Sequence, residues 1–376
     1  MTPYLYTEGM GACAENHAFV PETGRLCAHS PLLNCQDVRI RERPGIRSES
    51  MRRRQFLQLA GTTFAAGIAT VYASRSNAFR ANSGADSPRS TDAAAFAAVR
   101  RFADLTFGRI AYVERGTGDA ALFLHGAPLN GFQWRGAIDR LCHHRRCVAP
   151  DFMGLGYSQI RERQSLAARD QVAMLAALLD KLAIPSVDIV ASDSGGAVAQ
   201  LFVAHYPERV RTLLLTNCDV EPDSPPPKVR PVIDMARAGT LAVSTAKWLD
   251  DRALARATFG KAVFSDPNHF ADETIDYYFA PLVSSPLRRA QYEAFHIALA
   301  PNPLAGIEAS LKRSRVPVRI VWGTADDIFS QADAVYLDHL FPRSEGIRLL
   351  PGAKLFFPEE FPDVIAAEAM RLWRIA

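Results

Sequence analysis

One short stretch of the chain predicts a strand, a sharp turn and a helix in direct succession. The apolar run Val187–Val190 is followed by small residues, and a helical pattern then extends over Gly196–His205. At the centre of the turn stands Asp193, with Ala191 two positions before it and Gly195 two positions after it. Small side chains at those two positions let the backbone turn sharply. The stretch therefore predicts a carboxylate exposed at the carboxyl end of a strand.

The chain from about residue 96 alternates strand-like and helix-like segments. Uninterrupted apolar strands in such an alternation imply a largely parallel sheet covered by helices on both faces. Over residues 221–312 the pattern becomes helical, aromatic and punctuated by proline. We therefore expect an α/β core with an eight-stranded sheet over residues 96–220 and 313–376, and an inserted helical cap over residues 221–312. The expected elements are a hairpin over 105–114, strands over 121–124, 146–149, 187–190, 212–215, 318–321 and 347–350, and helices over 171–182, 196–205, 332–340 and 362–373.

The first 95 residues have a different pattern, which is typical of export. Arg53 and Arg54, one free position and Phe56-Leu57 resemble a twin-arginine signal. The apolar run that follows is too short and too mild for a stable membrane span. We expect a signal over residues 51–78, a linker over 79–95 and export to the periplasm by the twin-arginine machinery; a soluble amphipathic helix is the alternative. Met51 is well placed as the true start, which would make residues 1–50 a disordered or misassigned extension.

Composition narrows the classes of function. The chain has 376 residues, of which 48% are hydrophobic and 22% charged, as in soluble globular proteins. A net charge of +3 gives little reason to expect nucleic acid as a partner. Six cysteines show no metal-ligand spacing, and the odd number in the body (Cys142, Cys147, Cys218) argues against a full disulfide framework. We expect a small-molecule substrate, no metal, no cofactor, and free thiols in preference to a Cys142–Cys147 bridge.

The motifs around Asp193 occur in an order that resembles the α/β-hydrolase fold. The turn His125-Gly126-Ala127-Pro128 follows one predicted strand, Trp134-Arg135 comes shortly after it, and a Gly-rich loop from Pro150 to Ser158 follows the next strand. Together with the Asp-centred turn, these motifs resemble haloalkane dehalogenases and epoxide hydrolases over about 270 residues, from Leu105 to the end.

This resemblance implies that Asp193 is a nucleophile that forms an ester with an alkyl carbon. It also implies that the N–H groups of Ala127 and Ser194 form an oxyanion or anion pocket, and that His125 orients the loop. Two alternatives stay open at this point. Asp193 is a helix N-cap in one, and in the other Ser194 is a nucleophile shifted by one position.

This sequence has a match for the catalytic acid of the resembled families but none for their catalytic base. Asp326, in a Gly-x-x-Asp loop after a strand, is the predicted acid; the alternative is that it has only a structural role. Its neighbour Asp327 is expected to be solvated, and Asp219 is a weaker candidate for the acid. The base position falls on Leu355, within Pro351-Gly352-Ala353-Lys354-Leu355-Phe356, and no histidine follows His339. Leucine accepts no proton, and lysine is normally protonated at neutral pH. A base contributes about 10²–10⁴-fold, so an Asp193 ester is expected to accumulate. The candidate substitutes are His125 and His296, while His205 suits a helix end.

Two further departures bear on the substrate. Dehalogenases hold halide with a Trp and often an Asn, and those positions are Ser194 and Ala127 here, so a halide is disfavoured. Epoxide hydrolases use cap tyrosines, and the predicted cap contains Tyr277, Tyr278 and Tyr292. The expected function is hydrolysis of a small apolar ester, epoxide or halide centred on Asp193. The alternatives are a non-hydrolytic descendant, such as a lyase, an isomerase or a binding protein, and an interaction protein that keeps the turn as a relic.

Overall fold

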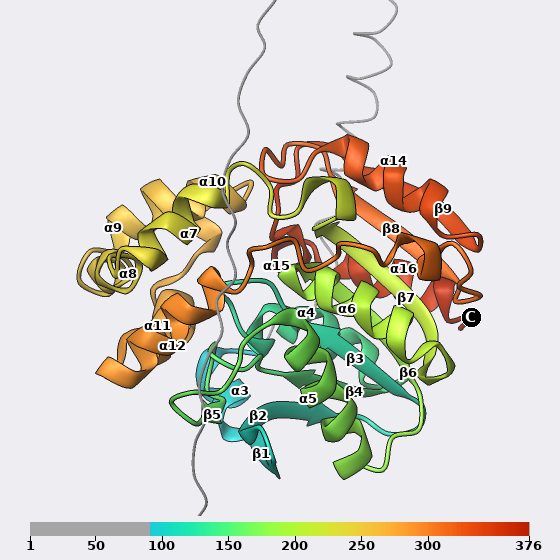
Figure 1. Ribbon diagram of the computed structural model, residues 1–376, viewed down its shortest axis with the longest axis horizontal. Helices are drawn as coiled ribbons and strands as arrows, with labels where there is room; N and C mark the ends of the chain where they lie inside the picture. The colour runs from blue at the N-terminus through green and yellow to red at the C-terminus, as the bar shows by residue number, and fades with distance from the viewer. Residues whose placement is uncertain (1–90, 376) are drawn as a thin grey trace, which may run out of the picture. The chain divides into compact units, whose positions relative to one another are not determined.

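The computed structural model describes residues 91–375, so the predicted signal, the segment before it and most of the predicted linker lie outside the described residues. These residues build one sheet in the order β1-β2-β4-β3-β6-β7-β8-β9 (Figure 1). The six strands from β4 to β9 along this path are parallel, while β1, β2 and β4 pair antiparallel. The strands are β1 (Arg100–Leu105), β2 (Gly108–Arg115), β3 (Ala120–Leu124), β4 (Arg146–Pro150), β6 (Val187–Asp193), β7 (Val210–Cys218), β8 (Val318–Gly323) and β9 (Ser344–Leu350).

The largely parallel sheet is confirmed, but the strand count is nine. The additional strand β5 (Gln159–Ile160) pairs with β2 outside the main path. Two residues are too few for a period to be recognised in the sequence, which is why this strand was not expected. The predicted hairpin is also shifted, because its two strands meet around residues 106–107.

Helices cover both faces of the sheet (Figure 1). Helices α5 and α6 pack together, and α4 and α16 pack together. Every residue of β3 and β8 is buried, as expected for strands covered on both sides. Helix α3 begins inside the predicted linker, where the Asp92 side chain accepts a hydrogen bond from the Ala95 N–H at 2.7 Å. These helices are α3 (Ala93–Ala98), α4 (Arg135–Leu141), α5 (Ala168–Lys181), α6 (Ser194–His205), α14 (Gln331–Leu340), α15 (Phe357–Glu360) and α16 (Pro362–Leu372).

Between β7 and β8 the chain forms a layer of helices that we call the cap (yellow to orange in Figure 1). The cap is fastened to the core by a buried network. Arg135 of α4 pairs with Glu359 of α15 at 2.7 Å, and the Tyr278 hydroxyl from the cap donates to the same carboxylate at 2.7 Å. The cap contains α7 (Arg230–Arg237), α8 (Leu241–Asp250), α9 (Arg252–Ala255), a π-helical turn (Arg256–Gly260), α10 (Lys261–Val263), α11 (Asp272–Val283) and α12 (Pro286–Ile297), and the short α13 (Glu308–Leu311) leads back to the core.

Two further features concern residues 91–375 as a whole. No helix in this part of the chain is both long enough and apolar enough to cross a membrane. Cys142, Cys147 and Cys218 are free thiols.

Candidate active site

Asp193 ends strand β6 in a backbone conformation that residues with a side chain rarely adopt. Its φ is 56° and its ψ is −134°. The turn also requires the glycines around it: a Cβ on Gly195 would lie 2.5 Å from the His125 carbonyl oxygen, and a Cβ on Gly126 would lie 2.6 Å from Cβ of Asp193. Such strain persists only where the surrounding structure holds it, and it is concentrated at functional sites. The turn therefore presses the His125-Gly126 loop against the Asp193 side chain.

Two backbone N–H groups reach the Asp193 carboxylate. The Ser194 N–H donates to Oδ1, and a hydrogen bond from the Ala127 backbone also favours the ionised form. The two predicted pocket residues thus meet on the carboxyl group of Asp193 itself. Asp193 is at the same time the N-cap of α6, so the capping role and the exposed turn coexist.

The environment of Asp193 disfavours its negative charge. Burial raises the pKa of the Asp193 carboxyl to about 7, and the charge of nearby Asp219 adds to the rise, while the hydrogen bonds oppose it. Near neutral pH both protonation forms are therefore populated. The carboxyl group is available as a nucleophile or as an acid, depending on pH.

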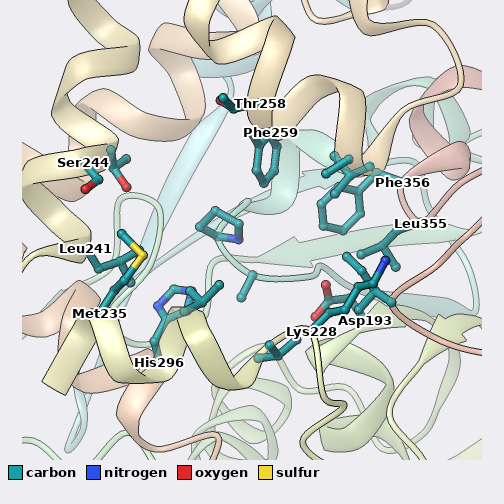
Figure 2. Close-up of a pocket in the computed structure, with 18 of the residues that line it drawn as sticks. Asp193, Lys228, Met235, Leu241, Ser244, Thr258, Phe259, His296, Leu355 and Phe356 are labelled. Carbon is teal, nitrogen blue, oxygen red and sulfur yellow. The ribbon is translucent and has the colours of Figure 1, made fainter.

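Asp193 lies on the wall of a cavity of about 620 Å³ between the core and the cap. Such a volume suits a small organic molecule. Figure 2 shows Asp193, Leu355 and Phe356 on one side of this cavity and the cap residues Met235, Leu241 and His296 on the other. Most of the residues that line the cavity are aliphatic or aromatic, and Trp248 and Phe259 are among them. The sequence pattern gave no means to distinguish these two aromatic residues from ordinary core residues.

Leu355 occupies the position where a base was expected. Its side chain is 2% exposed and lines the cavity. The loop around it is held by the Ala325 N–H, which donates to the Ala353 carbonyl at 2.9 Å, and by the Phe356 N–H, which donates to the Val263 carbonyl at 3.0 Å. The neighbouring Lys354 ammonium donates to the Lys261 carbonyl. The loop is thus well defined, but it offers a hydrocarbon to Asp193 where proton transfer needs a base.

Asp326, the predicted acid, is held by its own loop and does not line the cavity. The Asn217 amide donates to its Oδ2 at 2.7 Å, and the Ile328 N–H donates to its Oδ1 at 2.9 Å. Burial raises its pKa to about 6. Its neighbour Asp327 does line the cavity and pairs with Lys228. Among the described residues no histidine hydrogen-bonds to Asp326, and the Asn217 and Ile328 contacts hold its carboxylate within its own loop.

The two histidines considered as substitutes, His125 and His296, and the helix-end His205 have different surroundings. His125 is fully buried and uses both ring nitrogens, since Nδ1 bonds the Gly126 carbonyl at 2.9 Å and Nε2 accepts from the Phe152 N–H at 3.0 Å. Burial lowers its pKa to about 4. His205 bonds the Leu201 carbonyl at 2.8 Å, within its own helix. Only His296, among these three, lines the cavity; burial lowers its pKa to about 4, and Nδ1 bonds the Tyr292 carbonyl at 3.0 Å.

The three cap tyrosines also differ. Tyr277 accepts a hydrogen bond from Arg100, and Tyr278 belongs to the network that fastens the cap. Tyr292 lines the cavity, where its hydroxyl lies 3.1 Å from Oγ1 of Thr245. The structure therefore separates one cap tyrosine at the cavity from two with other partners. Among the described residues, no group of three His, Cys, Asp or Glu side chains is placed to bind a metal.

Comparison with known proteins shows which protein family has this architecture. A family model described as the alpha/beta hydrolase fold matches residues 120–361. Haloalkane dehalogenase 2 of Mycobacterium tuberculosis is 26% identical over 277 residues, which are 71% of this chain and 92% of that protein. The crystal structure of an ancestral haloalkane dehalogenase is 26% identical, with a TM-score of 0.61 over 73% of this chain and 99% of that one. An epoxide hydrolase, at 21% identity and a TM-score of 0.61 over 73% of this chain and 98% of that one, shares the fold.

Proposed function

The chain belongs to the α/β hydrolase fold family, of the branch that includes haloalkane dehalogenases and epoxide hydrolases, and from this we infer that it is a hydrolase whose reaction is centred on Asp193. In the proposed reaction, the Asp193 carboxylate attacks an alkyl carbon of a small apolar substrate and forms an ester, which water then cleaves. One observation carries this proposal: the strained turn holds a carboxylate, with two N–H donors on it, at the wall of a mostly apolar cavity. The donors would hold the oxyanion that forms when water attacks the ester.

Within this class of substrates, an epoxide is favoured over a halide. A leaving halide needs hydrogen-bond donors, and the two relevant side chains supply none to this cavity, because that of Ala127 has no polar atom and Ser194 does not line the cavity. An opening epoxide instead leaves an alkoxide that must be protonated, and the Tyr292 hydroxyl at the cavity wall is a donor for it. The proposed substrate class also includes esters whose alkyl carbon is reactive toward a carboxylate.

The proposed reaction is tested by incubating the purified protein with styrene oxide and measuring the intact mass. We expect a covalent adduct on wild type that is absent in Asp193→Asn. We also expect that turnover in water labelled with heavy oxygen places the label in the Asp193 carboxyl group. The proposal is overturned if styrene oxide, bromobutane and alkyl ester probes all give no adduct and no turnover.

A second candidate function rests on Leu355. A side chain that accepts no proton at the base position, beside a carboxyl group with a pKa of about 7, suits a non-hydrolytic acid–base reaction or a binding protein. In that case Leu355→His would create a hydrolysis that wild type lacks. If wild type already hydrolyses a substrate through an Asp193 ester, this second candidate is excluded.

We also propose that the protein is exported through the twin-arginine machinery and acts in the periplasm. The support is the Arg53-Arg54 pair, the Phe56-Leu57 pair and the mild apolar run after them, all of which lie outside the described residues. A small-molecule substrate would then meet the enzyme outside the cytoplasm.

A further inference from the structure

A second, much smaller cavity adjoins the main one. Its volume is about 20 Å³, and Leu299 lines both cavities. A cavity needs roughly 10–15 Å³ to admit one water molecule, which must then find two to four polar partners. The volume therefore matches a single water molecule, provided that the walls supply hydrogen bonds.

The walls supply them. Ser194, Asp219 and Ser224 line the small cavity. Ser194 is 4% exposed, and its hydroxyl lies within reach of the Asp193 carboxyl, whose pKa it lowers. Among residues 91–375 this hydroxyl has no other hydrogen-bond partner. A hydroxyl group donates one hydrogen bond and accepts up to two, so the Ser194 oxygen can still accept a hydrogen bond from a water molecule in the small cavity. The Ser224 hydroxyl donates to Oδ1 of Asp219 at 2.8 Å and so orients that carboxylate.

Asp193 itself does not line the small cavity, but its neighbour Ser194 does, and the sheet register brings Asp219 close to Asp193. Asp193 is the cross-strand partner of Cys218 in the parallel pair of β6 and β7, and Asp219 follows Cys218 directly. Neighbouring strands lie about 4.8 Å apart, so the two carboxyl groups are close, and the charge of Asp219 raises the pKa of Asp193. On the other side, Ser194 is the residue after the nucleophile.

We propose that the small cavity holds the water molecule that cleaves the Asp193 ester, and that Asp219 is the general base that takes a proton from this water. The inference rests on the proposed function, because it concerns the second half of that reaction. It assigns to Asp219 the task that Leu355 does not perform.

The step balances as follows for an alkyl ester of Asp193. The water oxygen bonds to Cγ of Asp193 while one water proton passes to Asp219. The negative charge develops on the carboxyl oxygen that accepts from the Ser194 N–H, and the Ala127 backbone also donates to this carboxyl group. The bond between Cγ and the alkyl oxygen then breaks, and the proton on Asp219 passes to that oxygen, which leaves as an alcohol. Asp193 is left as a carboxylic acid that ionises to solvent.

Electrostatics favours Asp219 as a base at this stage in particular. Burial raises its pKa to about 6, the Ser224 hydrogen bond opposes the rise, and the carboxylates of Asp223 and Asp333 add to it. Once Asp193 is esterified, its negative charge is absent, so the repulsion between the two neighbouring carboxylates is removed. Asp219 is therefore more readily ionised in the ester intermediate than in the free enzyme.

The test separates formation of the ester from its hydrolysis. Full-length protein is mixed rapidly with styrene oxide, quenched, and analysed for the Asp193 ester by intact mass. Asp219→Asn should slow hydrolysis of the ester by about 10²–10⁴-fold, so that the ester accumulates. At neutral pH it should form the ester as fast as wild type or faster, since the charge that disfavours ionised Asp193 is gone. Ser194→Ala should slow hydrolysis about tenfold, the effect of one hydrogen bond to the water.

The matched control is Asp223→Asn, which removes a nearby carboxylate that does not line the small cavity and should leave both steps near wild type. A merely structural role of Asp219 would slow both steps together, and that result would overturn the inference. If Asp219→Asn hydrolyses the ester at the wild-type rate, the inference fails while the proposed function stands. If no ester forms in wild type, both fall.

Discussion

At the scale of single residues, the protonation of Asp193 governs the expected chemistry. Only the ionised carboxylate attacks carbon, and its pKa is raised to about 7. We therefore expect the rate of ester formation to increase with pH through about 7 and to level off above it. Rapid mixing with styrene oxide over a range of pH measures this rate. A rate that decreases above neutral pH would instead identify Asp193 as an acid and favour the non-hydrolytic candidate.

The same raised pKa makes a prediction for stability. A carboxyl group whose pKa is higher in the folded state contributes stability that is fully present below the unfolded pKa of 3.8 and is lost as pH rises through about 7. Asp193→Asn removes this loss. We expect the variant to exceed wild type by about 2 kcal/mol in free energy of unfolding above pH ~8, since the cavity leaves the carboxylate partly accessible, and to match it below pH ~4. Urea unfolding at the two pH values measures the difference; an equal gain at both would contradict the assignment.

The residues of the turn were accessible from sequence because their chemistry is local. Asp193, Ser194 and Ala127 follow from small residues at fixed offsets after apolar runs. The small cavity was not accessible in this way. It depends on the register of β6 against β7 and on cap residues such as Phe295 and Leu299, which are about a hundred positions away in the chain. Asp219 was noted from sequence only as a weak candidate for the acid.

At the scale of elements, the loop from Pro351 to Phe356 fixes the position of Leu355. Its backbone contacts with Ala325 and Val263 hold residue 355 at the cavity wall. If Asp219 is the base of wild type, Leu355→His should change wild-type hydrolysis little but should restore about a hundredfold of the activity lost in Asp219→Asn. Single-turnover hydrolysis of the ester in the double variant measures the rescue. Leu355→Gln in the same background controls for size and should rescue nothing.

The network that fastens the cap makes a stability prediction of its own. Arg135→Met leaves the buried Glu359 carboxylate without its ionic partner and should cost about 3–5 kcal/mol in free energy of unfolding. Tyr278→Phe removes one hydrogen bond to the same carboxylate and should cost about 1.5 kcal/mol. Arg101→Met, in the exposed pair with Glu114, is the control and should change stability by about 0.5 kcal/mol or less. Equal losses of unfolding free energy in Arg135→Met and Arg101→Met would show that the buried network does not hold the cap to the core.

Among the elements, those with a strong period were the ones that sequence identified. The buried strands β3, β6 and β8 are mostly apolar, with Asp188 and Asp193 in β6 and Arg319 in β8 as the charged exceptions, and their assignment was confirmed. The misses were short or edge elements. Strand β5 has two residues, α3 starts within a polar stretch, and the turn of the first hairpin is displaced by contacts that no local pattern contains. The sequence predicts an element poorly where contacts with neighbouring elements, instead of the element's own residues, determine its position.

At the scale of the whole molecule, the order of the strands bears on export. The core closes only when β8 and β9 add to β7, and the whole cap lies between β7 and β8 in the chain. Contacts so distant in sequence form slowly, and the apolar strands would be exposed for as long as the chain stayed unfolded. A route that carries a folded protein avoids this exposure. Export of the folded protein stays a proposal that rests on residues 51–78, and it would avoid this exposure.

The proposed export gives the final prediction. Replacing Arg53 and Arg54 together by lysine keeps the charge of the segment but removes the arginine pair, so export should drop by at least about tenfold. The measurement is the share of protein, and of styrene oxide hydrolysis, in the periplasmic fraction. The matched control is Arg52→Lys, outside the pair, which should be exported like wild type. The retained protein should be folded, with its Asp193 ester forming at the wild-type rate. Undiminished export of the double variant would show that another route is used.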